Sequence, residues 1–318
     1  MKRIWLAPSS KNCGAMRRVI FSLAFSLLLS YSQAQKIHNK SIGLLTENDS
    51  YMLMGKDGYY TNGLTFSYAW TKKDTGSSTI NSIEFGQLMY NARNGSYKEE
   101  WKIDRPVTAY LFGKFEQTRF YHDNVLRWNI GLGTIGPNAL GRQMQEFIHS
   151  TLGMYKPQEW QFQLRNALSV DGGITYSPQI FAEQPIVNIY PIVSSDLGLT
   201  FTNIKVAALL TIGKKNTNAK SSIWNATLNN TENNFESFFY FRPNLTYNVY
   251  NATIQGGISS DDINAGSLNR LLFIPKFGWQ YTNNRISLNL GITHTGKEAK
   301  EQRNSQWYGS IGFNYQIN

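Results

Sequence analysis

Cysteine is almost absent from this sequence, and no long apolar segment follows its first 34 residues. The only cysteine among the 318 residues is Cys13, which lies in a segment that we expect to be removed. The remaining chain can then form no disulfide and use no thiolate chemistry. A transmembrane helix needs about 20 consecutive apolar residues, and no such run follows residue 34. If the exported chain resides in a membrane, it must cross it as a closed β-barrel.

The first 34 residues have the layout of a secretory signal. An apolar stretch runs from Val19 to about Leu29, and small and polar residues then lead to Ala34. The stretch is too short for a membrane anchor, so we predict cleavage after Ala34 and one domain over residues 35–318. Met16 is an alternative start. The basic residues before the apolar stretch are Lys2, Arg3, Lys11, Arg17 and Arg18.

Charged residues are scarce too, at 16% of the chain, and their balance depends on the signal. The whole chain has 31 basic and 21 acidic side chains, a net charge of +10. Removal of residues 1–34 leaves 26 basic and 21 acidic side chains, a net charge of +5. This mild excess suits an anionic partner such as lipopolysaccharide phosphates. No feature of the sequence favours nucleic acid.

The most regular pattern is an alternation of apolar and polar residues, which is typical of β-strands. It is clear over residues 64–70, 206–212 and 311–317. A soluble sandwich and a membrane barrel both fit it, but segments of about ten residues favour tilted membrane strands. Aromatic residues at Tyr59-Tyr60 and Trp279–Tyr281 suggest an interfacial girdle. We predict an all-β, transmembrane antiparallel β-barrel of about 12 strands, monomeric, in the outer membrane.

One segment departs from the strand pattern. From Ala139 to about Leu152 the residues are helix formers, with Pro137 before them and Gly153 as a stop. We predict one short helix inserted in a loop or in the lumen. Its spacing places four apolar residues in one stripe: Leu140, Met144, Phe147 and Ile148.

Two features offer chemistry. His149 lies on the predicted helix, and an imidazole is the usual general base near neutral pH. Residues 46–49, Thr-Glu-Asn-Asp, place two acidic side chains in the first predicted strand. They are either part of a polar barrel interior or oxygen ligands for a hard cation such as calcium.

These features together resemble the lipid A 3-O-deacylase family. Glu47-Asn48-Asp49 followed by residues 59–64, Tyr-Tyr-Thr-Asn-Gly-Leu, is similar to the N-terminal signature of that family. Asp104-Arg105-Pro106 resembles a motif that precedes a strand. Residues 131–149, which contain several glycines, the predicted helix and His149, resemble the next block of the family. Residues 157–164 resemble the block after it. The ordered set covers about residues 45–165.

The resemblance implies a twelve-stranded barrel whose site lies beside an extracellular helix and faces the outer leaflet. It implies that His149 deprotonates water for attack on the 3′-linked acyloxyacyl ester of lipid A. Calcium, with Asp49 as a ligand, would offset charge on the carbonyl oxygen. Asn48 and Thr61 would orient ligands or complete the oxyanion environment. Lys98 or Lys102 could bind a lipid A phosphate.

The chain departs from the family at one functional position. The family generally has an acidic residue six positions after the histidine, and here that residue is Tyr155. Tyrosine cannot act as a carboxylate at neutral pH. Glu146 and Glu159 are nearby acids that could substitute for it.

Other functions remain open for this sequence. A catalytically silent barrel that binds lipopolysaccharide or stabilises the membrane is favoured by Tyr155. A phospholipase-type barrel usually has a serine nucleophile beside its histidine, and no serine here has a convincing setting. A passive pore is disfavoured because side chains largely fill a barrel of this strand number.

Overall fold

A computed structural model describes residues 38–52, 58–71, 78–181, 183–229 and 235–317. The chain divides into two units, residues 1–36 and residues 37–318. The signal segment expected over residues 1–34 lies outside the described residues.

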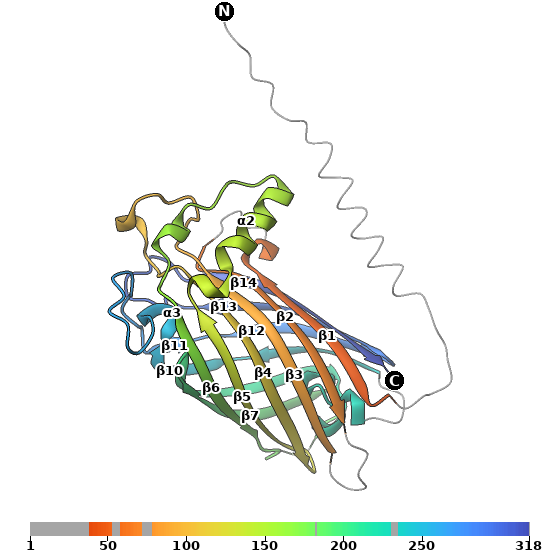
Figure 1. The fold of residues 1–318 in the computed structure, drawn as a ribbon. Helices are drawn as coiled ribbons and strands as arrows, with labels where there is room; N and C mark the ends of the chain where they lie inside the picture. The colour runs from red at the N-terminus through yellow and green to blue at the C-terminus, as the bar shows by residue number, and fades with distance from the viewer. Residues whose placement is uncertain (1–37, 53–57, 72–77, 182, 230–234, 318) are drawn as a thin grey trace, which may run out of the picture. The chain divides into compact units, whose positions relative to one another are not determined.

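The second unit is an antiparallel sheet of fourteen strand segments (Figure 1). They form twelve strands, because two strands are each interrupted by one proline. β9 and β10 continue one another across Pro243, and β11 and β12 continue one another across Pro275. The segments are β1 Lys40–Asn48, β2 Tyr60–Thr71, β3 Ser78–Tyr90, β4 Thr108–Tyr121, β5 Asn124–Ile135, β6 Ala167–Ser177, β7 Val187–Gly198, β8 Phe201–Lys214, β9 Glu236–Arg242, β10 Asn244–Asn251, β11 Leu271–Phe273, β12 Lys276–Asn283, β13 Ile286–Thr295 and β14 Gln306–Ile317.

The sheet closes on itself, so it is a barrel. β1 pairs with β14 from Lys40↔Ile317 to Asn48↔Gly309, and every other strand pairs with its neighbours in sequence. β8 pairs with both β9 and β10, which confirms that these two segments are one strand. Closure removes the free edges that an open sheet would expose. The predicted fold class and strand number are confirmed.

The faces of this barrel are reversed relative to a soluble protein. In β8, Ile204, Val206 and Ile212 are more than half exposed, whereas Asn203 and Thr211, which each adjoin one of them, are buried. Other strands repeat this pattern, with Phe66 and Ile130 exposed. An apolar outside and a polar inside are stable only when lipid surrounds the wall. The soluble sandwich is therefore wrong.

The predicted aromatic girdle was wrong at its first position. Tyr59 and Tyr60 are buried, and the Tyr60 hydroxyl donates a hydrogen bond of 2.6 Å to Glu47 Oε2. Trp279 and Tyr281 do lie on the outer face, alternating with buried Gln280. Rings also gather on the outer face of β2, β4 and β5, with neighbouring centroids 5.5–6.3 Å apart. They are Tyr68, Trp70, Phe115 and Trp128.

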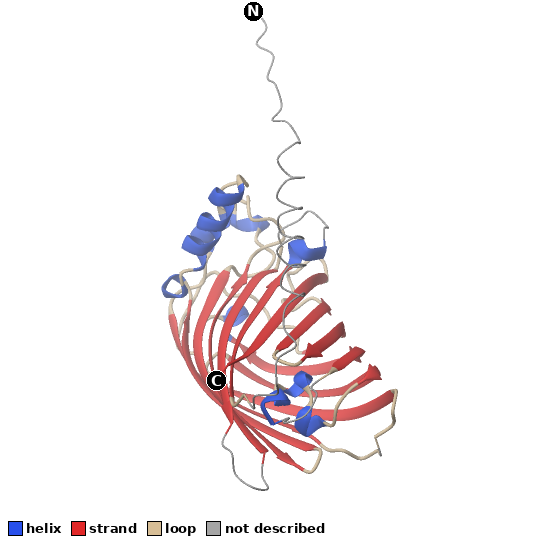
Figure 2. Ribbon diagram, turned by 90° about the vertical axis from the view of Figure 1, so that its right-hand side faces the viewer, coloured by secondary structure: helices blue, strands red, loops and turns tan. Residues whose placement is uncertain are grey.

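Helical segments lie at both ends of the barrel (Figure 2). At one end, here called the α2 end, the loop between β5 and β6 contains α2, as predicted. The α2 end also holds short turns and a second, four-residue helix. These elements are η1 Asp49–Met52, η2 Glu100–Lys102, η3 Pro137–Ala139, α2 Gly141–Leu152, η4 Glu159–Phe162 and α3 Ala252–Gln255.

At the opposite end, the loop between β8 and β9 enters the barrel. Its residues 215–229, here called the plug, contain η5 Asn218–Lys220, η6 Ser222–Trp224 and η7 Ala226–Asn229. The three turns contact β2, β3, β5 and β12, which lie on different sides of the wall. Trp224 and Leu228 of the plug pack in one apolar cluster with residues such as Phe238. The plug therefore fills this end of the lumen.

None of the described helices has the length and apolar character needed to cross a bilayer.

Candidate active site at the α2 end

The helix α2 presents a polar face to the barrel. Its buried residues, Gly141, Gln145 and His149, are spaced by four and share one face. Of the apolar stripe predicted from the sequence, Met144 packs against the buried cluster that contains Trp160, whereas Leu140 is 50% and Phe147 is 68% exposed. The helix ends at Gly153 (φ 68°), as predicted, in the left-handed conformation that favours glycine. The sequence placed the helix correctly, but the face that contacts the barrel combines one residue of the stripe, Met144, with polar contacts of Gln145.

His149 is held in one tautomer by the main chain. Its Nδ1 lies 2.7 Å from the carbonyl oxygen of Tyr155. Because a carbonyl oxygen only accepts hydrogen bonds, Nδ1 carries a proton, and in the neutral imidazole the lone pair is therefore on Nε2. The Tyr155 ring packs edge-on against the imidazole, with centroids 4.7 Å apart. This geometry gives His149 the protonation pattern of a general base.

A buried network of side chains links α2 to two strands and to η4. Thr61 Oγ1 donates to Asn91 Oδ1 at 2.8 Å. The Asn91 amide in turn donates to Gln145 Oε1 at 2.9 Å and to Glu159 Oε1. Gln145 Oε1 also accepts the indole N–H of Trp160. All five residues are buried, so each hydrogen bond constrains the position of α2 on the rim.

The structure distinguishes between the two acids near His149. Glu146 forms an ion pair of 3.1 Å with Arg142 on the exposed side of α2. Glu159 is completely buried and belongs to the network through Asn91. A Cβ atom at Gly95 would overlap the Tyr155 hydroxyl and lie 3.0 Å from Glu159 Oε1. The Tyr155 side chain and the Glu159 carboxylate therefore converge on the same small space.

Asn48 and Asp49 lie where β1 ends and η1 begins. The buried Asp49 carboxylate accepts the Gly58 N–H at 2.8 Å through Oδ2. Asn48 Oδ1 accepts the Ser50 N–H at 2.7 Å, and its amide lies 3.4 Å from Asn62 Oδ1. Within the described residues, no group of three or more His, Cys, Asp or Glu side chains is placed to hold a metal. One carboxylate with neighbouring amide oxygens fits calcium, which takes oxygen ligands and also accepts carbonyls and water.

Asp104 ties together the loops around this site. Its carboxylate accepts the Tyr59 hydroxyl at 2.8 Å and the main-chain N–H groups of Arg93 and Arg303. Burial and the hydrogen bond to Asp104 raise the pKa of Tyr59 to about 12. The Asp104-Arg105-Pro106 motif is completed by Arg105, which is buried and pairs with Glu298 at 3.1 Å. The motif therefore joins loops distant in sequence.

The two lysines proposed as phosphate ligands lie in and before η2. Lys98 is exposed, and its carbonyl accepts a hydrogen bond from Gln161. Lys102 pairs with Glu99 at 3.0 Å and lies over the Trp101 ring. Contact with a phosphate would require Lys102 to exchange Glu99 for the ligand. Their role stays a prediction.

The structure thus gathers only some of the expected residues. It connects Thr61 with α2 through Asn91 and Gln145, while Asn48 and Asp49 contact their own strand ends and neighbouring loops. Asn91 was missed by the sequence reasoning. Asn91 follows directly after β3. A single polar residue at the end of a strand is common and gave no signal of its own.

The closed barrel with an apolar outer face and a polar site at its rim defines the class as outer-membrane β-barrel proteins. The profile of the family described as outer membrane protein LpxR matches residues 19–317. The chain belongs to this family.

Two solved structures match this chain at low sequence identity, and the first of them shares its fold. LpxR from Salmonella typhimurium is 19% identical, with a TM-score of 0.71, over 87% of this chain and 100% of that one. The β-domain of the Bordetella autotransporter BrkA is 9% identical, with a TM-score of 0.46, over 89% of this chain and 100% of that one. No curated protein sequence matches this chain.

Proposed function

We propose that this protein hydrolyses the 3′-linked acyloxyacyl ester of lipid A in the outer leaflet, with His149 as the general base. The observation that carries the proposal is the single tautomer of a buried histidine on the rim of a barrel of this family. A base must offer a lone pair to the water that it deprotonates. The Tyr155 carbonyl ensures that Nε2 offers it.

The reaction then follows from the residues of this chain. Nε2 of His149 takes a proton from water, and the resulting hydroxide attacks the ester carbonyl carbon. The tetrahedral intermediate collapses by breaking the bond to the sugar 3′ oxygen, which receives the proton from the imidazolium. The products are a fatty acid and a free 3′ hydroxyl group. Throughout, the Nδ1 hydrogen bond holds the ring in place.

Glu159 is the acid that we assign in place of the residue at position 155. A carboxylate near the site stabilises the imidazolium that forms when His149 takes up the proton. Glu159 is buried within the network that positions α2, whereas Glu146 is occupied by Arg142 on the outside. Glu159 would thereby supply the carboxylate that Tyr155, in place of the usual acid, does not.

Calcium is the proposed cofactor, and Asp49 would hold it, with Asn48 and Asn62 supplying further oxygens. When bound, calcium would polarise the ester carbonyl and offset the charge that develops on its oxygen. With one carboxylate in the donor set, we expect weak affinity, with a Kd of roughly 10⁻⁴ to 10⁻³ M.

The test is mass spectrometry of lipid A from cells that express the wild type, His149→Ala, Asp49→Ala or Tyr155→Glu. Loss of a 3′-linked acyl group with the wild type and with Tyr155→Glu, but not with His149→Ala or Asp49→Ala, would support the hydrolase. Removal of calcium by a chelator should suppress the reaction in purified outer membranes. Each variant must first be shown to be inserted, by its heat-dependent mobility in gels.

The second candidate is a silent barrel that binds lipopolysaccharide, which Tyr155 at the acidic position favours. Intact lipid A with the wild type but deacylated lipid A with Tyr155→Glu would support this alternative. Intact lipid A with every inserted variant in the presence of calcium would exclude the enzyme.

A further inference from the structure

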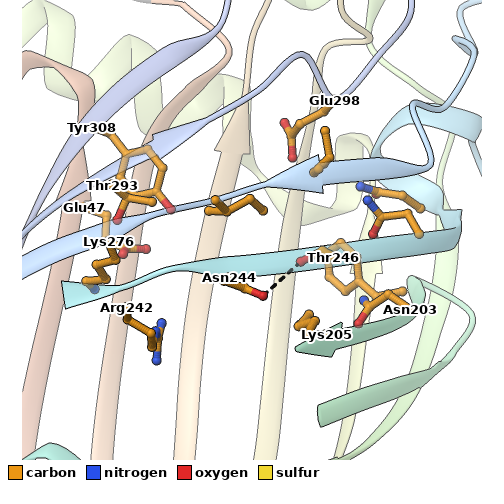
Figure 3. A pocket seen from close by; sticks show the side chains of 15 residues that line it. Glu47, Asn203, Lys205, Arg242, Asn244, Thr246, Lys276, Thr293, Glu298 and Tyr308 are labelled. Carbon is orange, nitrogen blue, oxygen red and sulfur yellow. Dashed lines mark hydrogen bonds between the residues drawn. The ribbon is translucent and has the colours of Figure 1, made fainter. Parts of the chain in front are cut away.

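A second polar site lies in the lumen, away from α2. A cavity of about 270 Å³ opens between β8, β10, β12 and β13 (Figure 3). Neither His149 nor Asp49 lines it. Polar and charged side chains dominate its wall, including Asn203, Asn244 and Thr246. Its residues take no part in the proposed ester hydrolysis.

Two cations face this cavity from directly opposite positions. Arg242 at the end of β9 and Lys276 at the start of β12 are paired residues in the antiparallel ladder. Figure 3 shows the two side chains on neighbouring strands, with Glu47 and Tyr308 beside Lys276. Like charges directly opposite one another destabilise a sheet. The pair therefore requires either solvent or an anion to offset its repulsion.

The strands are interrupted at the same level. Pro243 follows Arg242 and Pro275 precedes Lys276, so the two prolines also face each other across the ladder. The ladder resumes beyond them, where Ile274 N–H donates to the Asn244 carbonyl at 2.7 Å. Prolines in strands mark such breaks because they have no N–H to donate. The wall is thus irregular beside the two cations.

The other charges that line the cavity have partners. Lys205 pairs with Asp196 at 2.6 Å, and Glu298 pairs with Arg105 at 3.1 Å. Glu47 Oε2 accepts the Tyr60 hydroxyl at 2.6 Å.

Arg242 and Lys276 differ from these groups. Among the residues that the structure describes, neither forms a salt bridge or a hydrogen bond with another side chain. Glu47 is the carboxylate whose charge acts on Lys276, but one carboxylate cannot balance two cations.

We propose that Arg242 and Lys276 form a luminal binding site for an oxyanion, a phosphate or a carboxylate. A guanidinium and an ammonium are the side chains that bind such groups through charge-assisted hydrogen bonds. The amides of Asn244 and Asn248 line the same cavity and supply neutral donors, while the Thr246 hydroxyl donates to Asn244 Oδ1. An oxyanion between the two cations removes the cross-strand repulsion and joins β9 to β12.

The test is calorimetric titration of the purified full-length barrel in detergent with inorganic phosphate and, separately, with acetate. Chloride is adjusted to keep the ionic strength constant, because screening alone would otherwise mimic a weak effect. We expect saturable binding that falls by roughly tenfold or more in Arg242→Gln and in Lys276→Gln, since each loses a charged hydrogen bond. Binding of phosphate alone would assign a phosphate-type ligand, and binding of acetate as well would assign a carboxylate-type ligand.

Arg119→Gln and Lys220→Gln are matched controls, because both side chains are exposed and neither lines the cavity. They should bind phosphate as the wild type does. The thermal stability of the wild type should rise with phosphate and not with chloride, a readout that needs no variant. In chloride alone, Arg242→Gln should be at least as stable as the wild type, because the repulsion is gone. The absence of saturable binding of either anion to the wild type, or equal binding to all variants, would overturn the proposal.

Discussion

At the residue scale, the decisive contact is the one between His149 Nδ1 and the carbonyl of Tyr155. The side chain of residue 155 is not what fixes the tautomer. We therefore expect Tyr155→Phe to retain deacylation within a factor of about three, since it keeps both the carbonyl and the ring. His149→Gln should lower the rate by roughly 10²–10⁴, the usual contribution of a general base. Both rates are measured by release of fatty acid from purified lipid A.

The variant Glu159→Gln distinguishes the role of Glu159 in the buried network from the role of its carboxylate charge. The amide can still accept a hydrogen bond from Asn91, so the network and the fold should persist. In the proposed role the carboxylate favours the imidazolium, so its replacement should lower the maximal rate by about tenfold or more while KM changes little. A fall in KM alone, or a rate equal to that of the wild type, would remove Glu159 from the mechanism.

Lys215, at the start of the plug, makes the stability of the fold depend on pH. It is buried over the Tyr190 ring, 3.9 Å from Glu183, and burial lowers its pKa from 10.5 to about 8. Between these two values the unfolded chain binds more protons than the folded one, so stability rises with pH. We expect greater resistance to urea at pH 9.5 than at pH 7.5. In Lys215→Met this rise should be smaller, and an unchanged rise would assign it to other groups.

At the scale of elements, the position of α2 depends on one amide. Gln145 accepts from both Asn91 and Trp160, so Gln145→Leu removes the acceptor of the buried Trp160 indole N–H, at about 1–3 kcal/mol. The Asn91 amide loses one of its two acceptors and keeps Glu159. Hydrogen exchange over residues 141–152 should become much faster. Gln143→Leu is the control, because Gln143 lies on the same helix and is exposed. Similar exchange in both variants would show that the network does not anchor the helix.

The same helix shows what the sequence could and could not predict. Helix formers and Gly153 placed α2 over residues that the structure confirms. The apolar stripe predicted the contact face of the helix only at Met144, because in a membrane rim apolar side chains need not be buried in protein. The predicted place of Tyr60 in the girdle was wrong for a related reason. An aromatic ring at a strand end can face the lumen when its hydroxyl has a hydrogen-bond partner there, as Tyr60 has in Glu47. Alternation predicts two faces, but not which one receives a particular ring.

At the scale of the whole molecule, twelve strands and closure followed from alternation, segment length and the need to satisfy every main-chain group in lipid. That residues 215–229 form a plug was not predicted, because these residues are polar and show no strand or helix periodicity. Its entry into the lumen depends on contacts with four strands that are distant in sequence. Asn91 joined Thr61 to α2 in the same way. Contacts of this kind leave no local periodicity in the sequence.

The lipid-facing wall makes a prediction about the fold as a whole. Ile130 lies in the middle of β5 and is 53% exposed on the apolar face. Ile130→Arg should cost about 2–4 kcal/mol of folding free energy in lipid vesicles, as a cation does near the bilayer midplane. Ile186→Arg, the same change just before β7, should cost only about 0–1 kcal/mol. Equal costs at both positions would contradict the placement of the wall in the bilayer.

The hydrogen bond to the Tyr155 carbonyl also bears on how this protein can change over evolutionary time. A side chain is inherited codon by codon, and one mutation removes it. A main-chain carbonyl is inherited with the path of the turn after α2, and every residue type supplies it. Once the carbonyl orients His149 and a buried carboxylate lies four residues further on at Glu159, position 155 can drift without loss of the tautomer. Activity in this family should then track the path of that turn more closely than the identity of the residue within it.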